Sequence, residues 1–187
     1  MTERGLKGVP NPSAIFLQRN EEVSSGSIVV VIWEGTRPML VELQALVDEV
    51  SAGYPKRVAV GLDHQRLAMH LAVLHRHCGI TLGDQDVFAN VVGGVRIQET
   101  GADLALLLAV LSSFRDRVLP RDLIVFGELG LTGELRPVAN GQERLREAAK
   151  HGFKQAIVPY ANRPKDKLPG MRVHGVQDLS AALEILA

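Results

Sequence analysis

Histidine side chains offer the first candidates for chemistry in this sequence. They concentrate in one stretch, at His64, His70, His75 and His77. A zinc site on a helix needs ligands about one turn apart, as in HExxH. That motif does not occur here, and two helical turns separate His70 from His77. The pattern favours solvated or capping histidines over a metal site.

Ser112–Ser113 and the carboxylates of Asp84 and Asp86 are the next candidates. Serine is a nucleophile only beside a base, and paired carboxylates can perform acid–base chemistry. The serines follow an apolar run, where hydroxyls commonly satisfy the last backbone groups of a helix. The aspartates belong to a short polar loop. We therefore expect structural hydroxyls and solvated carboxylates.

The elements that must position such residues are a β-rich first third followed by alternating strands and helices. The β-branched run over 27–33 predicts a strand, which Gly35–Pro38 turns back into a second strand over 39–47. Asp63 is expected to cap a helix that ends near Cys78. The other predicted elements are strands over 58–60, 87–97, 123–126 and 156–158, helices over 102–111, 141–151 and 179–186, and a hairpin over 127–137.

Composition indicates one globular domain. The chain has 187 residues, of which 46% are hydrophobic and 22% charged, as is ordinary for a folded domain. Lys plus Arg and Asp plus Glu both number 21, so a polyanion site must be a local patch. The single cysteine, Cys78, indicates a reducing compartment, for which we expect the cytoplasm. No apolar run reaches the roughly 20 residues of a membrane span, so no membrane contact is expected.

Three stretches, over 88–97, 99–105 and 126–138, resemble the proteolytic domain of the Lon family. The segments NPSAIFL, WEGTRP, NVVGG and GQERLREAAKHGF resemble more closely the C-terminal part of the RadA (Sms) family of bacterial DNA repair proteins. The resemblance implies an α/β (α+β) fold of the Lon proteolytic type, related to ribosomal S5 domain 2, with an N-terminal β-hairpin extension. It also implies a linker over 1–12 that joins the domain over 13–187 to an N-terminal RecA-like ATPase core.

The Lon family uses a serine nucleophile activated by a lysine, and the resemblance assigns these positions to Gly101 and Gln142. Glycine has no hydroxyl and an amide is not a base, so catalytic residues are not expected. The phosphate-binding motif GxxxxGK[ST] is also missing. The sequence therefore predicts no enzymatic role for this chain. Residual Ser/Lys-type peptidase activity is the disfavoured alternative.

Neither a cofactor nor a metal is expected in this chain. The resemblance implies ATP and magnesium for the missing core and zinc for the family's N-terminal finger. It also implies a ring-forming scaffold within a DNA-dependent ATPase and branch-migration helicase of recombinational DNA repair. The expected partners are further copies of this chain in a homohexameric ring, single- or double-stranded DNA without sequence preference, and a RecA-type recombinase. A protein-binding adaptor without DNA contact is the alternative.

Cations gather locally although the whole chain is neutral, as a phosphate-binding surface requires. The candidate DNA-binding residues are Arg115, Arg117, Arg121, Arg144, Arg146, Lys150, Lys154, Arg163, Lys165 and Lys167. Solvated helix faces and partners of helical ion pairs are the alternative interpretation. Only 4% of the residues are aromatic, so we expect contacts to the DNA backbone rather than base stacking.

Overall fold

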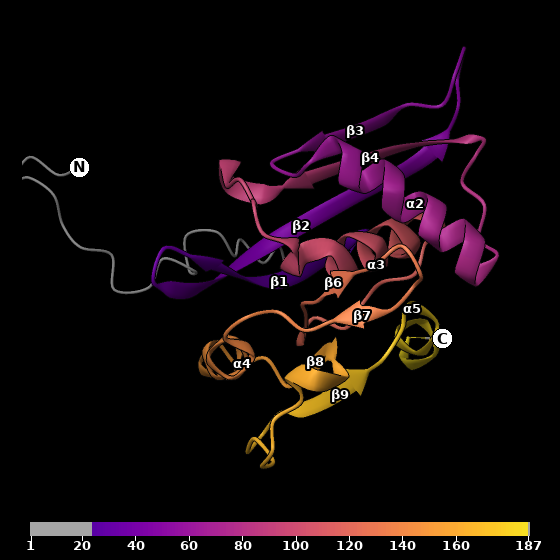
Figure 1. Ribbon diagram of the computed structural model, residues 1–187. Helices are drawn as coiled ribbons and strands as arrows, with labels where there is room; N and C mark the ends of the chain where they lie inside the picture. The colour runs from indigo at the N-terminus through magenta and orange to yellow at the C-terminus, as the bar shows by residue number, and fades with distance from the viewer. Residues whose placement is uncertain (1–23, 187) are drawn as a thin grey trace, which may run out of the picture.

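The computed structural model describes residues 24–186, so the predicted linker over 1–12 lies outside the described residues. A mixed sheet with strand order β3-β4-β2-β1-β5-β8-β9 forms the centre (Figure 1). Its strands are β1 (Ser27–Glu34), β2 (Arg37–Glu49), β3 (Arg57–Val60), β4 (Gln85–Val91), β5 (Leu123–Val125), β8 (Gln155–Pro159) and β9 (Arg172–Val176). Most neighbouring strands are parallel, and the antiparallel pairs of this sheet are the two that β2 forms with β1 and β4. The α/β prediction is confirmed, and the Lon-type architecture stays a prediction.

The helices agree closely with the hydrophobic pattern. They are α2 (His64–Cys78), α3 (Asp103–Phe114), α4 (Gly141–Lys150) and α5 (Leu179–Ile185), and a small ribbon of β6 (Glu128–Leu129) and β7 (Leu135–Arg136) follows β5. As predicted, the side chain of Asp63 caps α2 by accepting a hydrogen bond from the backbone of Gln65 at 2.7 Å. Helix α3 is buried over Asp103–Ser112, because it packs on β1 and β2 and contacts α2 as well.

The hairpin of β1 and β2 lies in the middle of the sheet, so its prediction as an extension is wrong. β1 pairs with β5 in parallel, and β2 pairs with β4 in antiparallel orientation. The physical reason is burial on both faces: Val30, Val31 and Ile32 follow one another along β1 and are each at most 1% exposed. A strand that is apolar on both sides must be covered on both sides.

Two segments differ from the predicted strands. The strand over 87–97 ends at Val91, because Gly93 and Gly94 adopt φ angles of +82° and +72° and turn the chain away. The sequence predicts no strand after 156–158, whereas the structure has a further strand, β9, over Arg172–Val176. The polar residues Arg172 and His174 interrupt the apolar sequence of β9, so hydrophobicity alone does not indicate a strand there.

The serines at the end of α3 are structural, as predicted. Ser112 Oγ accepts a hydrogen bond from the backbone N–H of Gly26 at 2.8 Å, and Ser113 Oγ accepts one from Val47 at 2.9 Å. These bonds attach the end of α3 to β1 and β2. Within the described part of the chain, no helix has the length and apolar character that crossing a membrane would require.

Candidate functional site

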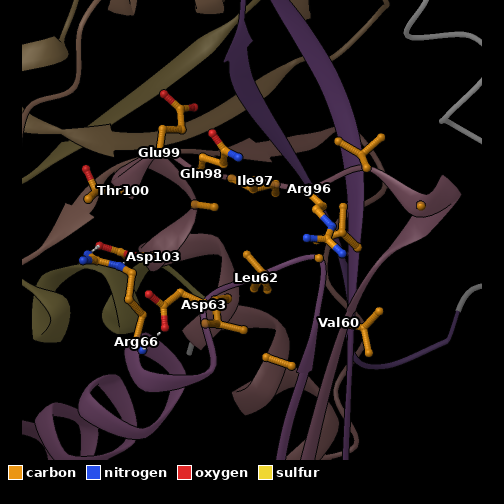
Figure 2. Close-up of a pocket in the computed structure, with 17 residues that line it drawn as sticks. Val60, Leu62, Asp63, Arg66, Arg96, Ile97, Gln98, Glu99, Thr100 and Asp103 are labelled. Atoms are coloured by element: carbon orange, nitrogen blue, oxygen red, sulfur yellow. Dashed lines mark hydrogen bonds and ion pairs between the residues drawn. The ribbon is translucent and has the colours of Figure 1, made fainter.

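A pocket of about 870 Å³ opens where β3 ends and α2 and α3 begin (Figure 2). The loop from β3 to α2 forms one wall, and the segment over 94–100 that leads from β4 to α3 forms the other. Charged and polar side chains line it on both walls (Figure 2), among them Arg66, Arg96, Gln98, Glu99 and Asp103. The pocket therefore combines charged side chains with apolar ones such as Val60, Leu62 and Ile97, and it is built on strand ends and helix starts.

The carboxylate of Asp103 is buried at the start of α3 and holds one side of this pocket. Both of its oxygens contact the Arg66 guanidinium, one of them at 2.9 Å, and the backbone N–H of Leu129 donates to it at 3.1 Å. Nε2 of His70 lies 2.9 Å from Oδ1. Burial raises the pKa of Asp103, but the contacts with His70 and Arg66 lower it by more, so the pKa lies below its usual value.

The histidine prediction is wrong for His70. This residue is 1% exposed and faces Asp103, whereas His64, His75 and His77 are exposed. Apart from the ion-pair contact with Asp103, neither ring nitrogen of His70 has a well-formed hydrogen bond. Across residues 24–186, no group of three or more His, Cys, Asp or Glu side chains is arranged to hold a metal ion.

A second ion pair joins Glu99, half-buried at the pocket wall, to the buried guanidinium of Arg144 on α4. The two carboxylate oxygens of Glu99 each accept a hydrogen bond of 2.6 Å from the guanidinium. The same guanidinium donates to the backbone carbonyls of Val31 and Ala139 at 2.7 and 2.9 Å. Glu99 also accepts a bond from the backbone N–H of Trp33 at 3.0 Å. The Arg144 guanidinium therefore connects α4, β1 and the pocket wall.

These contacts remove Arg144 from the DNA-binding candidates. The residue is 1% exposed, so its charge is not available to an external phosphate. Helical spacing places Arg144 on the same face of α4 as Leu145 and Ala148, but sequence reasoning counted it with the surface cations because arginine is seldom fully buried. Its partner Glu99 lies far away in the sequence, and no local signal indicates the pair.

Gly101 and Gln142 occupy the starts of α3 and α4. Gly101 is buried, and a Cβ atom added there would lie 3.1 Å from Glu99 Oε1 and 3.4 Å from Arg144 Nη1. Gln142 is half-buried, two residues before Arg144. The Glu99–Arg144 pair thus fills the space beside Gly101 and holds the starts of the two helices together. Next to Gly101, the Thr100 hydroxyl donates to Glu128 at 2.8 Å.

A second candidate surface lies where β5, β8 and β9 begin. The backbone N–H groups of Lys154 and Gln155 both donate to the carbonyl of Asp122 at 3.0 Å, and that of Arg172 donates to the carbonyl of Lys154 at 2.8 Å. The loop from α3 to β5 reaches the same edge of the sheet. We call this surface the basic edge, and its cations, all exposed, are Arg115, Arg117, Arg121, Lys154 and Arg172.

The structure distributes the predicted DNA-binding cations over several elements of the fold. Arg146 and Lys150 are exposed on α4, and Lys150 lies 3.6 Å from Glu147. Arg163, Lys165 and Lys167 are exposed in the connection from β8 to β9. The Arg163 guanidinium lies over the Tyr160 ring, 4.4 Å from its centroid. Residues adjacent in sequence are therefore divided between different parts of the surface, and the basic edge collects cations from three separate segments.

The chain is similar in sequence to an enzyme subunit and to DNA repair proteins. The family described as subunit ChlI of Mg-chelatase matches residues 49–162, more than half of the chain. DNA repair protein RadA of Haemophilus influenzae is 63% identical over 186 residues, and that of Escherichia coli is 65% identical over 185. The Bacillus subtilis protein of the same name is 45% identical over 189 residues.

The chain corresponds to the C-terminal part of these relatives. The alignments cover 100%, 99% and 98% of this chain but only 41%, 40% and 40% of the three proteins. The chain therefore spans about two-fifths of the length of the curated relatives it matches.

The family match contradicts the prediction that the chain has no enzymatic role. That prediction rested on Gly101, Gln142 and the missing phosphate-binding motif, whereas the matched family is described as a subunit of an enzyme. The physical reason for the error is general. Losing one pair of catalytic side chains and lacking one motif excludes those particular chemistries, but it does not exclude chemistry that other residues perform.

Proposed function

Because the chain belongs to the family described as subunit ChlI of Mg-chelatase and matches the C-terminal part of DNA repair protein RadA, we propose that it contacts the DNA backbone during DNA repair. The contact surface in this proposal is the basic edge. The cytoplasm, an N-terminal ATPase core and a RecA-type recombinase are the proposed setting. The observation that carries the proposal is the grouping of exposed cations from three segments at one edge of the sheet.

Three charges of the basic edge, those of Arg115, Arg117 and Lys154, are available to an external ligand. Among residues 24–186, none of Arg115, Arg117 and Lys154 forms an ion pair. The nearby carboxylate of Asp116 accepts a hydrogen bond from Ser25 at 2.8 Å. The surface resembles one that binds phosphate groups, because unpaired arginine and lysine side chains bind polyanions by releasing their counterions.

The loop that carries Arg115 and Arg117 is attached to the fold through its backbone. The carbonyl of Arg117 accepts a hydrogen bond of 2.5 Å from Ser112 Oγ, and its N–H donates to the carbonyl of Ser112 at 2.9 Å. The positive charge of the edge also affects its surroundings. Burial and then the charge of Arg172 lower the pKa of His174. A fixed loop of cations supports backbone contact without sequence preference.

The test is DNA binding by the double variant Arg115→Glu with Arg117→Glu. We expect its affinity for labelled DNA to fall at least about tenfold and the salt slope, d log K/d log[salt], to become shallower by about 2, since each phosphate contact contributes about 0.9. Fluorescence anisotropy at about 50 and 200 mM salt measures both quantities, with single- and double-stranded DNA compared.

A matched control is the double variant Arg37→Glu with Arg76→Glu. Both residues are exposed, lie outside the basic edge and undergo the same change of charge. We expect this control to lose far less affinity. Equal losses in the two variants would show a general charge effect and reject the basic edge. An unsubstituted chain that binds no DNA would favour the protein-binding adaptor.

Self-association is the second function we propose, as the scaffold of a homohexameric ring. It is supported by large apolar side chains on the surface. Tyr54, Val118 and Leu131 are 93%, 50% and 65% exposed, and burying such side chains between copies would remove apolar area from water.

The prediction is an assembly of about six times the chain mass of 20.3 kDa. Light scattering coupled to size exclusion measures the mass, since a closed ring gives one species over a range of concentrations. A constant mass of 20.3 kDa would contradict the ring for this chain.

A further inference from the structure

Strand β3 is the edge of the main sheet. It pairs only with β4, and no other strand of the described chain lies along its second side. The N–H of Val87 donates to the carbonyl of Lys56 at 2.9 Å. Because alternate residues of a parallel strand point the same way, Val58 and Val60 face β4 with their backbone groups, whereas Arg57 and Ala59 face the open side. The open side therefore offers backbone donors and acceptors to another strand.

The face of the sheet beside this edge is apolar and accessible. Leu46 on β2, Phe88 on β4 and Val58 on β3 are directly opposite one another in the strand register. Leu46 is 57% exposed, Val58 39% and Val60 56%. A groove of about 380 Å³ runs along these side chains. A strand added to β3 would continue this apolar row with its own side chains on the same face.

The pocket of about 870 Å³ lies beside the same edge strand. Ala59 and Val60 of β3 contribute to its lining, and Arg96 lies on the pocket wall near Val60 (Figure 2). The pocket carboxylates already have partners: Asp63 caps α2, Glu99 pairs with Arg144, and Asp103 pairs with Arg66.

Arg96 is the basic side chain of this pocket that lacks an ion-pair partner among the described residues. It is exposed and forms no ion pair with any residue in 24–186. A ligand that enters from the β3 edge would therefore meet an uncompensated guanidinium. Its chemical complement is a carboxylate.

We propose that β3 binds an extended peptide segment of a partner protein as an additional strand. The peptide has apolar side chains at alternate positions, beside Val58 and Val60, and acidic side chains between them, on the face of Arg96. Backbone hydrogen bonds to Arg57 and Ala59 supply affinity, and the two faces supply specificity. This site is separate from the basic edge, so it does not depend on the proposed DNA contact.

The probe is a capped eight-residue peptide in which valine and aspartate alternate, labelled with a fluorophore. Two further probes separate the contributions of charge and backbone. One replaces each aspartate by lysine, and one places proline at two central positions two residues apart, which removes two backbone N–H donors on the same side of the strand. We expect the valine–aspartate peptide to bind the full chain with an affinity at least about tenfold higher than that of the proline peptide, because two backbone hydrogen bonds are lost. The lysine peptide is expected to bind more weakly than the aspartate peptide.

Two readouts locate the site. Hydrogen exchange should show new protection of the Arg57 and Ala59 amides when the valine–aspartate peptide is present. The variant Arg96→Glu should lower the affinity for that peptide about fivefold, the upper range for an exposed ion pair. The same variant should bind the lysine peptide more tightly than the aspartate peptide. The matched variant Arg76→Glu, also at an exposed arginine, should change neither affinity.

The proposal is overturned by any of three results: equal binding of the proline peptide, protection only at amides away from β3, or an unchanged preference in Arg96→Glu. Binding too weak to detect at about 1 mM peptide would overturn it as well, since that limit corresponds to about −4 kcal/mol. Circular dichroism of each variant confirms that the chain is folded, and Arg96 is an exposed side chain whose replacement leaves the core intact.

Discussion

Replacing Arg144 by alanine is expected to lower the free energy of unfolding by about 3–5 kcal/mol. The change removes every hydrogen bond of a guanidinium that is 1% exposed and leaves the Glu99 carboxylate without its bidentate partner. It also orphans the carbonyl of Val31 inside the sheet. Denaturant unfolding measures the loss, and thermal unfolding should show a melting temperature lower by roughly 10 °C.

The matched control is Arg146→Ala, two residues away on the same helix. Arg146 is exposed, so its removal is expected to change stability by no more than about 0.5 kcal/mol. Combining Arg144→Ala with Glu99→Gln should restore part of the lost stability, because the uncompensated charge is removed. Similar stabilities for Arg144→Ala and Arg146→Ala would contradict a structural role for the buried pair.

Replacing Asp103 by asparagine is expected to cost about 3–5 kcal/mol at neutral pH. Asparagine keeps the shape and one acceptor, but it removes the charge that holds Arg66 and faces His70. The Arg66 guanidinium would then adjoin a neutral group at the start of α3. Urea unfolding at pH 7 measures the difference, and Asp63→Asn, which preserves the cap at an exposed position, is the control.

The pH dependence gives a second signature of Asp103. Its pKa in the folded chain lies below the usual value of 3.8, so the folded state binds the proton less readily than the unfolded state. The stability that this carboxylate contributes is therefore complete above about pH 4 and is lost as the pH falls through the lowered pKa. The difference between the unsubstituted chain and Asp103→Asn should shrink in that range. A difference independent of pH would show that charge is not the cause.

Local patterns predicted most helices because their signals are local. Asp63 and the apolar spacing of α2 define its start and its buried face within one segment. The place of the β1–β2 hairpin depends on which strands pair with its two edges, and those pairings join residues far apart in sequence. Strand β9 lacked an apolar pattern because Arg172 and His174 are polar and most of its residues are only partly buried. Hydrophobic periodicity does not carry this kind of information.

For the candidate sites too, local features could be predicted from the sequence, whereas contacts between distant segments could not. The exposed cations of the basic edge were predicted one by one from local charge, but their grouping depends on the parallel strands that begin side by side. The pocket was not predicted at all. Its charges, Arg66 with Asp103 and Arg144 with Glu99, come from segments that only the tertiary fold brings together.

The Glu99–Arg144 pair has a mechanical consequence. Glu99 belongs to the pocket wall, and Arg144 belongs to a helix of 10 residues whose end leads directly to Lys154 at the basic edge. Two short hydrogen bonds therefore couple the positions of these parts. A force that displaces α4 must therefore either carry the pocket wall with it or break this ion pair.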